Sequence, residues 1–208
     1  MATPNLDILH LRFSKSVEDP VVAAGTAGSV FSVVQREDYI NRAINDLTAD
    51  IYHIVGMNKS REILQSMETT QAIAAFSSSG VAVASDYTDM PTSLIKTGST
   101  NIFSYYTKKD ELDNNVNPNI SAAYLISGNK IYAYESGAIL NTGAGTFYYL
   151  RKDAGVQNTT DINISPKFWG AVIDLACILA FEETGELTSA SARASRVKSI
   201  LNLIGNIQ

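Results

Sequence analysis

Several features that would assign a protein to a compartment or a partner are missing from this sequence. The 208 residues include one cysteine, Cys177, which excludes an internal disulfide. No run of about 18 apolar residues is present, so no membrane-spanning helix is expected. Residues 1–13 lack the basic start and apolar stretch of a secretory signal. The net charge of −5 argues against binding nucleic acid by neutralising phosphates.

Charge of either sign is also scarce. Charged residues make up 18% of the chain, whereas roughly a quarter is usual in soluble domains. Hydrophobic residues make up 45%, so serine, threonine and asparagine take the place of the missing charges. Two kinds of protein fit this composition. One is an ordinary globular domain, and the other is a subunit covered by its neighbours, because interface centres are depleted in Lys, Glu and Asp.

Apolar residues recur at helical spacing toward both ends of the chain. Ser32 can cap a helix over residues 35–55, and a short continuation is expected to about residue 67. A second apolar stripe follows Ser165-Pro166, and a last helix ends near Gly205. The short join between the last two stripes predicts a helical hairpin over about residues 165–205.

The middle of the chain, about residues 80–151, predicts a small antiparallel β-layer. Gly128-Asn129 lies between two runs of aromatic and β-branched residues, which is typical of a two-residue hairpin turn. If Ser127 opposes Lys130, then Ile126 faces Ile131, Tyr124 faces Ala133 and Leu125 faces Tyr132. Both faces of this hairpin carry large residues, so we expect it to be covered on both sides. Its tyrosines can belong to a packed sheet or to a binding surface.

The order of these elements predicts an α+β fold that is mainly helical. It would be a helical bundle with an inserted small antiparallel β-layer and an extended N-terminal arm. The arm would comprise residues 1–31, where Leu6–Phe13 reads as an extended segment, and residues 32–208 would form a single domain. Because an isolated strand is not stable alone, the arm needs a partner within or outside the chain.

No group of residues points to catalysis, a cofactor or a metal ion. His10 and His53 are not at metal-ligand spacing from another His or Cys. His53 is typical of a cation near a helix C-terminus, and Cys177 is expected to be a small buried hydrophobe. We therefore predict no catalytic, cofactor-binding or metal-binding residues, and a protein that is not an enzyme. A hydrolase whose site is assembled from distant residues, with Cys177 or His53 in a cleft, is the alternative.

The end of the chain has charge of one sign only. From Leu187 to Gln208 the charged residues are Arg193, Arg196 and Lys198, and the preceding helix is acidic near its end. The basic residues can pair with that helix within the chain, or they can dock on an acidic partner. The candidate partner-interface residues are these basic residues together with apolar residues of the arm and tyrosines of the hairpin. They are Leu9, Leu11, Phe13, Tyr132, Tyr134, Arg193, Arg196 and Lys198.

The layout resembles the head–tail connector proteins of tailed bacteriophages, the adaptor or ring subunits below the portal, of the podovirus or crAss-like type. The resemblance covers about residues 32–187 and rests on patterns of residue type. The segments that carry it are an opening helix with an Asn-x-Ala inside it, a β excursion, and a closing helix introduced by Ser-Pro. They are Gln35–Ala43, Tyr124–Glu135, Thr146–Arg151, Ile164–Trp169, Ala171–Ala176 and Glu182–Gly185.

The resemblance implies a structural subunit of a virion, located at the head–tail interface and assembled in the bacterial host cytoplasm. Members of this family form a homo-oligomeric ring of about twelve copies with heterologous contacts. The implied partners are the portal, other tail or ring proteins, and genome DNA that passes through the lumen without sequence-specific binding; no membrane and no cofactor are implied. The alternative is a tail-side structural or receptor-binding virion protein with a Tyr-rich glycan-binding sheet.

Overall fold

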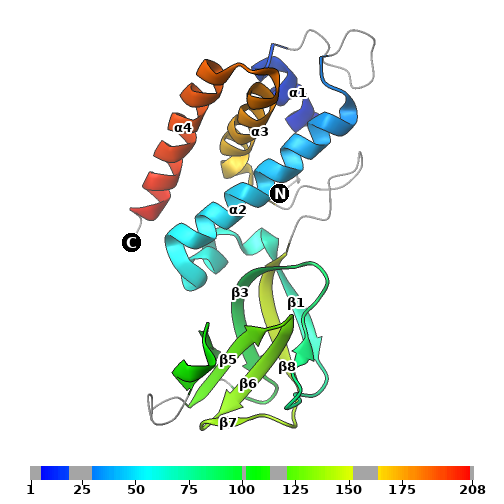
Figure 1. The fold of residues 1–208 in the computed structure, drawn as a ribbon, viewed down its shortest axis with the longest axis vertical. Helices are drawn as coiled ribbons and strands as arrows, with labels where there is room; N and C mark the ends of the chain where they lie inside the picture. Colours follow the sequence, from blue (N-terminus) through cyan, green and yellow to red (C-terminus); the bar gives the residue numbers. More distant parts are fainter. Residues whose placement is uncertain (1–5, 19–29, 100–101, 113–120, 152–163, 207–208) are drawn as a thin grey trace. The chain divides into compact units, whose positions relative to one another are not determined.

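The chain forms two compact units, each with its own core. A computed structural model describes residues 6–18, 30–99, 102–112, 121–151 and 164–206 (Figure 1). Residues Met1–Met67 and Lys152–Gln208 make up the helical unit, and Glu68–Arg151 make up the β unit. The β unit is therefore an insertion in a helical unit to which both ends of the chain belong. No helix within the described ranges is long and apolar enough to cross a membrane.

The described residues of the helical unit form four α-helices and two short 3-10 helices. Their bounds are α1 Leu6–Ser16, α2 Val33–Ile63, η1 Gln65–Met67, η3 Pro166–Phe168, α3 Trp169–Thr184 and α4 Leu187–Gly205. The predicted cap at Ser32 is confirmed. The backbone N–H of Gln35 donates to the Ser32 hydroxyl at 3.2 Å, and the backbone N–H of Ser32 donates to the side-chain Oε1 of Gln35 at 3.0 Å. Gly56, with φ 74° and ψ 174°, divides α2 into two helical segments.

Helix α3 packs against α4, α2 and α1, and α2 also contacts α4 (Figure 1). Nine of its sixteen residues are buried, because small and apolar side chains occupy almost its whole circumference. Gly185 ends α3 in the left-handed conformation, and α4 then runs back along α3. The predicted helical hairpin is therefore confirmed.

The prediction of an extended arm over residues 1–31 is wrong for Leu6–Ser16, which form the helix α1; residues 1–5 and 19–29 of that arm lie outside the described residues. Leu9 and Phe13 are fully buried and lie one helical turn apart. The Phe13 ring lies 5.7 Å from that of Phe31 and 5.9 Å from that of Tyr39. Leu9, Leu11 and Phe13 alternate as in a strand, but Leu9 and Phe13 also have the spacing of one helix face. Packing against the rest of the helical unit favours the helix.

The β unit is an eight-stranded mixed sheet that curls on itself (Figure 1). The order of pairing is β1-β8-β3-β4-β5-β6-β2, with β7 also on β6, and β4 and β5 are parallel. A short 3-10 helix, η2, spans Lys109–Leu112. The strands are β1 Glu68–Ile73, β2 Val81–Ala82, β3 Tyr87–Lys96, β4 Ile102–Tyr106, β5 Ala122–Ser127, β6 Lys130–Glu135, β7 Ala138–Ile139 and β8 Gly145–Arg151.

The predicted hairpin is confirmed in its register. Ser127 pairs with Lys130, Ile126 with Ile131, Leu125 with Tyr132 and Tyr124 with Ala133. Gly128 and Asn129 both have positive φ, which the two-residue turn requires. Thr146–Arg151, quoted above as part of the β excursion, lie in strand β8.

The fold predicted from the sequence, a helical bundle with a small antiparallel β-layer, is wrong. The sheet begins at Glu68 rather than near residue 80, it has eight strands, and one of its pairs is parallel. It also has its own aromatic core, in which Phe103, Tyr124 and Phe147 are almost completely buried. Met90 and Pro91 lie within β3, where the register shifts on both sides of Pro91. The shift accommodates a proline within a paired strand.

Candidate functional site

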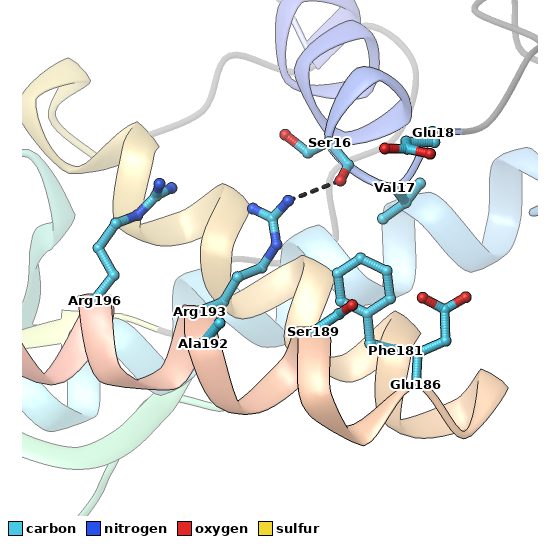
Figure 2. A pocket seen from close by; sticks show the side chains of 9 residues that line it. All are labelled: Ser16, Val17, Glu18, Phe181, Glu186, Ser189, Ala192, Arg193 and Arg196. Carbon is cyan, nitrogen blue, oxygen red and sulfur yellow. Dashed lines mark hydrogen bonds between the residues drawn. The ribbon is translucent and has the colours of Figure 1, made fainter.

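An open cleft of about 650 Å³ lies in the helical unit, between the end of α1 and the first half of α4 (Figure 2). Arg193 and Arg196 are at one end of the cleft in this view, and Glu18 and Glu186 are at the other. The cleft is lined by Ser16, Val17, Glu18, Phe181, Glu186, Ser189, Ala192, Arg193 and Arg196.

The basic end of the cleft is built on one buried acid, Asp174 of α3, whose side chain is 1% exposed. Arg193 Nη1 donates to Asp174 Oδ1 at 2.9 Å, and Arg196 Nε donates to Oδ2 at 2.5 Å. Arg196 also donates through Nη2 to Oδ1. Because Arg193 and Arg196 are three residues apart, they share one face of α4 and reach the same carboxylate.

Arg193 joins three helices. Its Nη2 donates to the backbone carbonyl of Ser16 at 2.7 Å, near the end of α1 (Figure 2). Its guanidinium lies 5.5 Å from the centre of the Phe181 ring, a cation–π contact. One carboxylate is shared by two guanidiniums, so this end of the cleft keeps a surplus positive charge. The arrangement can hold the helices together and attract an acidic group of a partner.

A second hollow, of about 350 Å³, lies in the β unit beside the hairpin. Tyr132 and Tyr134 point to the same face of β6 and pack against a small apolar cluster that includes Leu112 and Leu125. Burial, followed by the neighbouring Tyr132, raises the pKa of the Tyr134 hydroxyl. The hollow is lined by Ser78, Thr107, Lys109, Leu125, Ile126, Ser127, Tyr132, Tyr134 and Ile139.

The candidate interface residues do not form a single surface. Leu9 and Phe13 are buried inside the helical unit, and Leu11 is half-buried. Arg193 and Arg196 pair with Asp174 of their own chain, whereas Lys198 is exposed. In the β unit, Tyr132 and Tyr134 are half-buried and line the hollow.

Sequence reasoning missed the contribution of α1 to the cleft. Ser16 and Glu18 lie in the segment predicted as an extended arm, and that prediction gives no contact with α4. One signal was present: Asp174 is an isolated acid within an apolar helix, and a buried acid needs a cationic partner. The basic residues of the last helix are such partners.

The residues considered for catalysis lie outside both hollows. Cys177 is fully buried in α3, and burial raises the pKa of its thiol to about 11, which disfavours the nucleophilic thiolate. His53 is exposed on α2, and His10 is buried on α1. Within the described residues, no group of three or more His, Cys, Asp or Glu side chains is arranged to hold a metal ion.

No protein-family model matches the chain, and no curated protein is similar to it.

Proposed function

We propose that the protein is a structural subunit of the head–tail connector ring of a tailed bacteriophage. In this role it lies below the portal, extends the DNA channel and provides a docking surface for tail proteins. The single observation that carries the proposal is the outward face of α4, the side of that helix directed away from α3. The resemblance of the sequence to connector proteins determines which kind of assembly we propose.

The outward face of α4 has the composition of an interface. Only three of the nineteen residues of α4 are buried: Ala190, Val197 and Ile204. The solvent side of a surface helix normally carries charge along its length, but apart from Arg196 and Lys198 this one carries small or uncharged side chains and the 67%-exposed Leu203. The exposed residues of α4 are Leu187, Thr188, Ser191, Ala192, Ala194, Ser195, Arg196, Lys198, Ser199, Asn202 and Leu203.

Further apolar side chains are exposed on the same unit. Val34 in the first turn of α2 is 73% exposed, and Leu187 at the start of α4 is 67% exposed. In a ring, such surfaces would be covered by neighbouring copies, because each subunit presents two different faces to its neighbours. The net charge of −5 suits a channel through which DNA slides without being held.

The test is assembly with a portal. Recombinant protein is measured by native mass spectrometry alone and after mixing with the portal of a short-tailed phage. At low protein concentration we expect a monomer alone, and with portal a closed ring of about twelve copies, the number that the resemblance to connector proteins implies. A chain that binds no portal and forms no ring in virions would contradict the proposal.

A second candidate function is favoured by the hollow beside the hairpin. Tyr132 and Tyr134 offer ring faces next to Ser78, Ser127 and Lys109, a combination suited to stacking and hydrogen bonding with a sugar. The protein would then be a tail-side structural or receptor-binding virion protein.

A glycan array distinguishes the second candidate from the connector. Saturable binding that is lost in Tyr132→Ala and Tyr134→Ala, and kept in the control Tyr52→Ala of the helical unit, would favour it. Absence of binding to any sugar would remove it.

A further inference from the structure

The helical unit carries two exposed faces of opposite charge, on α2 and on α4. A ring of identical copies requires two different faces that fit each other. The inference below rests on the proposed function and names the contact that would build the ring.

The exposed face of α2 is acidic. Asp38, Arg42, Asp46 and Asp50 follow one another at steps of four residues, and all are exposed. Arg42 lies 3.6 Å from Asp38, but no described residue forms an ion pair with Asp46 or Asp50. Like charges four residues apart repel on a helix, and burial together with Asp46 raises the pKa of Asp50. A cation from outside this copy would relieve that repulsion.

The exposed face of α4 carries basic side chains at its edges and short side chains in its middle. Arg196 remains 64% exposed although it shares Asp174 with Arg193, and Lys198 forms no ion pair with any described residue. Around the circumference of the helix, Ser195 and Ser199 lie between Arg196 and Lys198, on the outward face. Short side chains let a second helix approach closely, so that Lys198 and Arg196 can reach its carboxylates.

We infer that the acidic face of α2 in one copy docks against the basic face of α4 in a second copy. The two faces cannot meet within one copy, because each is exposed to solvent there. Charge complementarity selects the second copy over an unrelated partner, since one chain supplies both signs. The contact is heterologous, so repeating it closes a ring or extends a filament.

The test reverses one face at a time. Variant A carries Asp46→Lys and Asp50→Lys, and variant B carries Ser195→Glu and Lys198→Glu. Arg196 is left intact because it holds the buried Asp174. Each variant alone presents two faces of the same sign, whereas an equal mixture of A and B restores opposite signs at every contact. The matched control is Lys108→Glu, an exposed charge reversal in the β unit.

Assembly on portal rings is measured by native mass spectrometry. Variants A and B alone should assemble about tenfold more weakly or worse, and the equal mixture and the control should assemble like the unmodified chain. Full assembly of A or B alone would overturn the inference while the proposed function stands. Failure of the mixture to recover would overturn it as well. Circular dichroism checks that each variant is folded. Asp50→Asn replaces variant A if A does not fold, and Lys198→Ala replaces variant B if B does not fold.

Sedimentation without portal separates this inference from the proposed function. At high protein concentration the unmodified chain should self-associate, A and B alone should not, and their mixture should recover the association. An unmodified chain that stays monomeric at all concentrations would overturn the docking. Self-association without any binding to portal would instead overturn the proposed function and leave the docking in place.

Discussion

Asp174 shows how one residue can organise several helices. Its carboxylate is buried in α3, and its charge is balanced by Arg193 and Arg196 from α4. Through Arg193, the same network extends to the Ser16 carbonyl near the end of α1. A charge in this position is stable only with its partners, so the network constrains where α4 can lie on α3.

Asp174→Asn should therefore destabilise the protein strongly. The amide keeps the shape of the side chain but leaves two guanidiniums beside a neutral group. We expect a loss of about 2–4 kcal/mol in the free energy of unfolding, measured by urea denaturation. The matched control is Asp38→Asn, which removes the exposed partner of Arg42 and should cost less than about 0.5 kcal/mol. Equal effects of the two substitutions would contradict this account.

Tyr39 should make the stability of the protein sensitive to alkaline pH. Its hydroxyl donates to Glu183 at 2.5 Å, and burial, together with this bond, raises its pKa from 10.0 to about 12. The folded state thus holds the proton more tightly than the unfolded chain does. This contribution is fully present below pH 10.0 and is lost as the pH rises through about 12.

Tyr39→Phe should reduce the decline in the free energy of unfolding between about pH 10 and about pH 12. Glu183→Gln keeps the burial of Tyr39 and should reduce the decline only in part. Part of the decline should remain in both variants, because burial and Asp86 also raise the pKa of Tyr149. An identical decline in Tyr39→Phe and the unmodified protein would refute the assignment to Tyr39.

At the scale of single elements, Gly56 determines the shape of α2. Its φ of 74° and ψ of 174° lie in a region that is essentially reserved for glycine. Helical periodicity on either side of Gly56 predicts two helical segments, and both are present. The break between them depends on this one residue.

Gly56→Ala should destabilise the protein by about 1–3 kcal/mol, because a side chain is strained in this conformation. Gly170→Ala is the matched control. Gly170 is exposed in the first turn of α3, and an added Cβ would meet nothing within 4 Å. That substitution should stabilise the protein by up to about 1 kcal/mol. Thermal unfolding followed by circular dichroism measures both, and a stabilising Gly56→Ala would show that the kink is not required.

Local patterns predicted the elements best where neighbouring residues decide the structure. The hairpin around Gly128-Asn129 and the capped start of α2 at Ser32 depend on contacts within a few residues, and both are confirmed. The parallel pairing of β4 with β5 and the two-residue strands β2 and β7 have no comparable local signal. They are strands because distant segments supply their hydrogen-bond partners.

At the scale of the whole molecule, the β unit is an insertion whose two ends lie together. Its first strand pairs with its last, and Glu68 lies opposite Leu150. The chain therefore enters and leaves the β unit at adjacent positions in one sheet. Such an insertion can have its own core, as the buried aromatic cluster around Phe147 indicates.

A fragment of residues 68–151 should therefore fold alone. We expect a β-type circular dichroism spectrum and one cooperative thermal transition. The substitution Phe147→Ala should lower the stability of the fragment by about 3–5 kcal/mol, since this ring is fully buried. A fragment without a cooperative transition would show that the β unit depends on the rest of the chain.

Local patterns in the sequence are enough to predict the helices with a clear apolar stripe, the cap of α2 at Ser32, the end of α3 at Gly185 and the register of one hairpin. These features depend on side chains within one or two turns of each other. Only the tertiary structure decided that Leu6–Ser16 is a helix, that the β-layer is an eight-stranded sheet, and that Arg193 and Arg196 share Asp174. Each of these depends on burial against residues distant in the chain, and local periodicity does not record which distant residues come together.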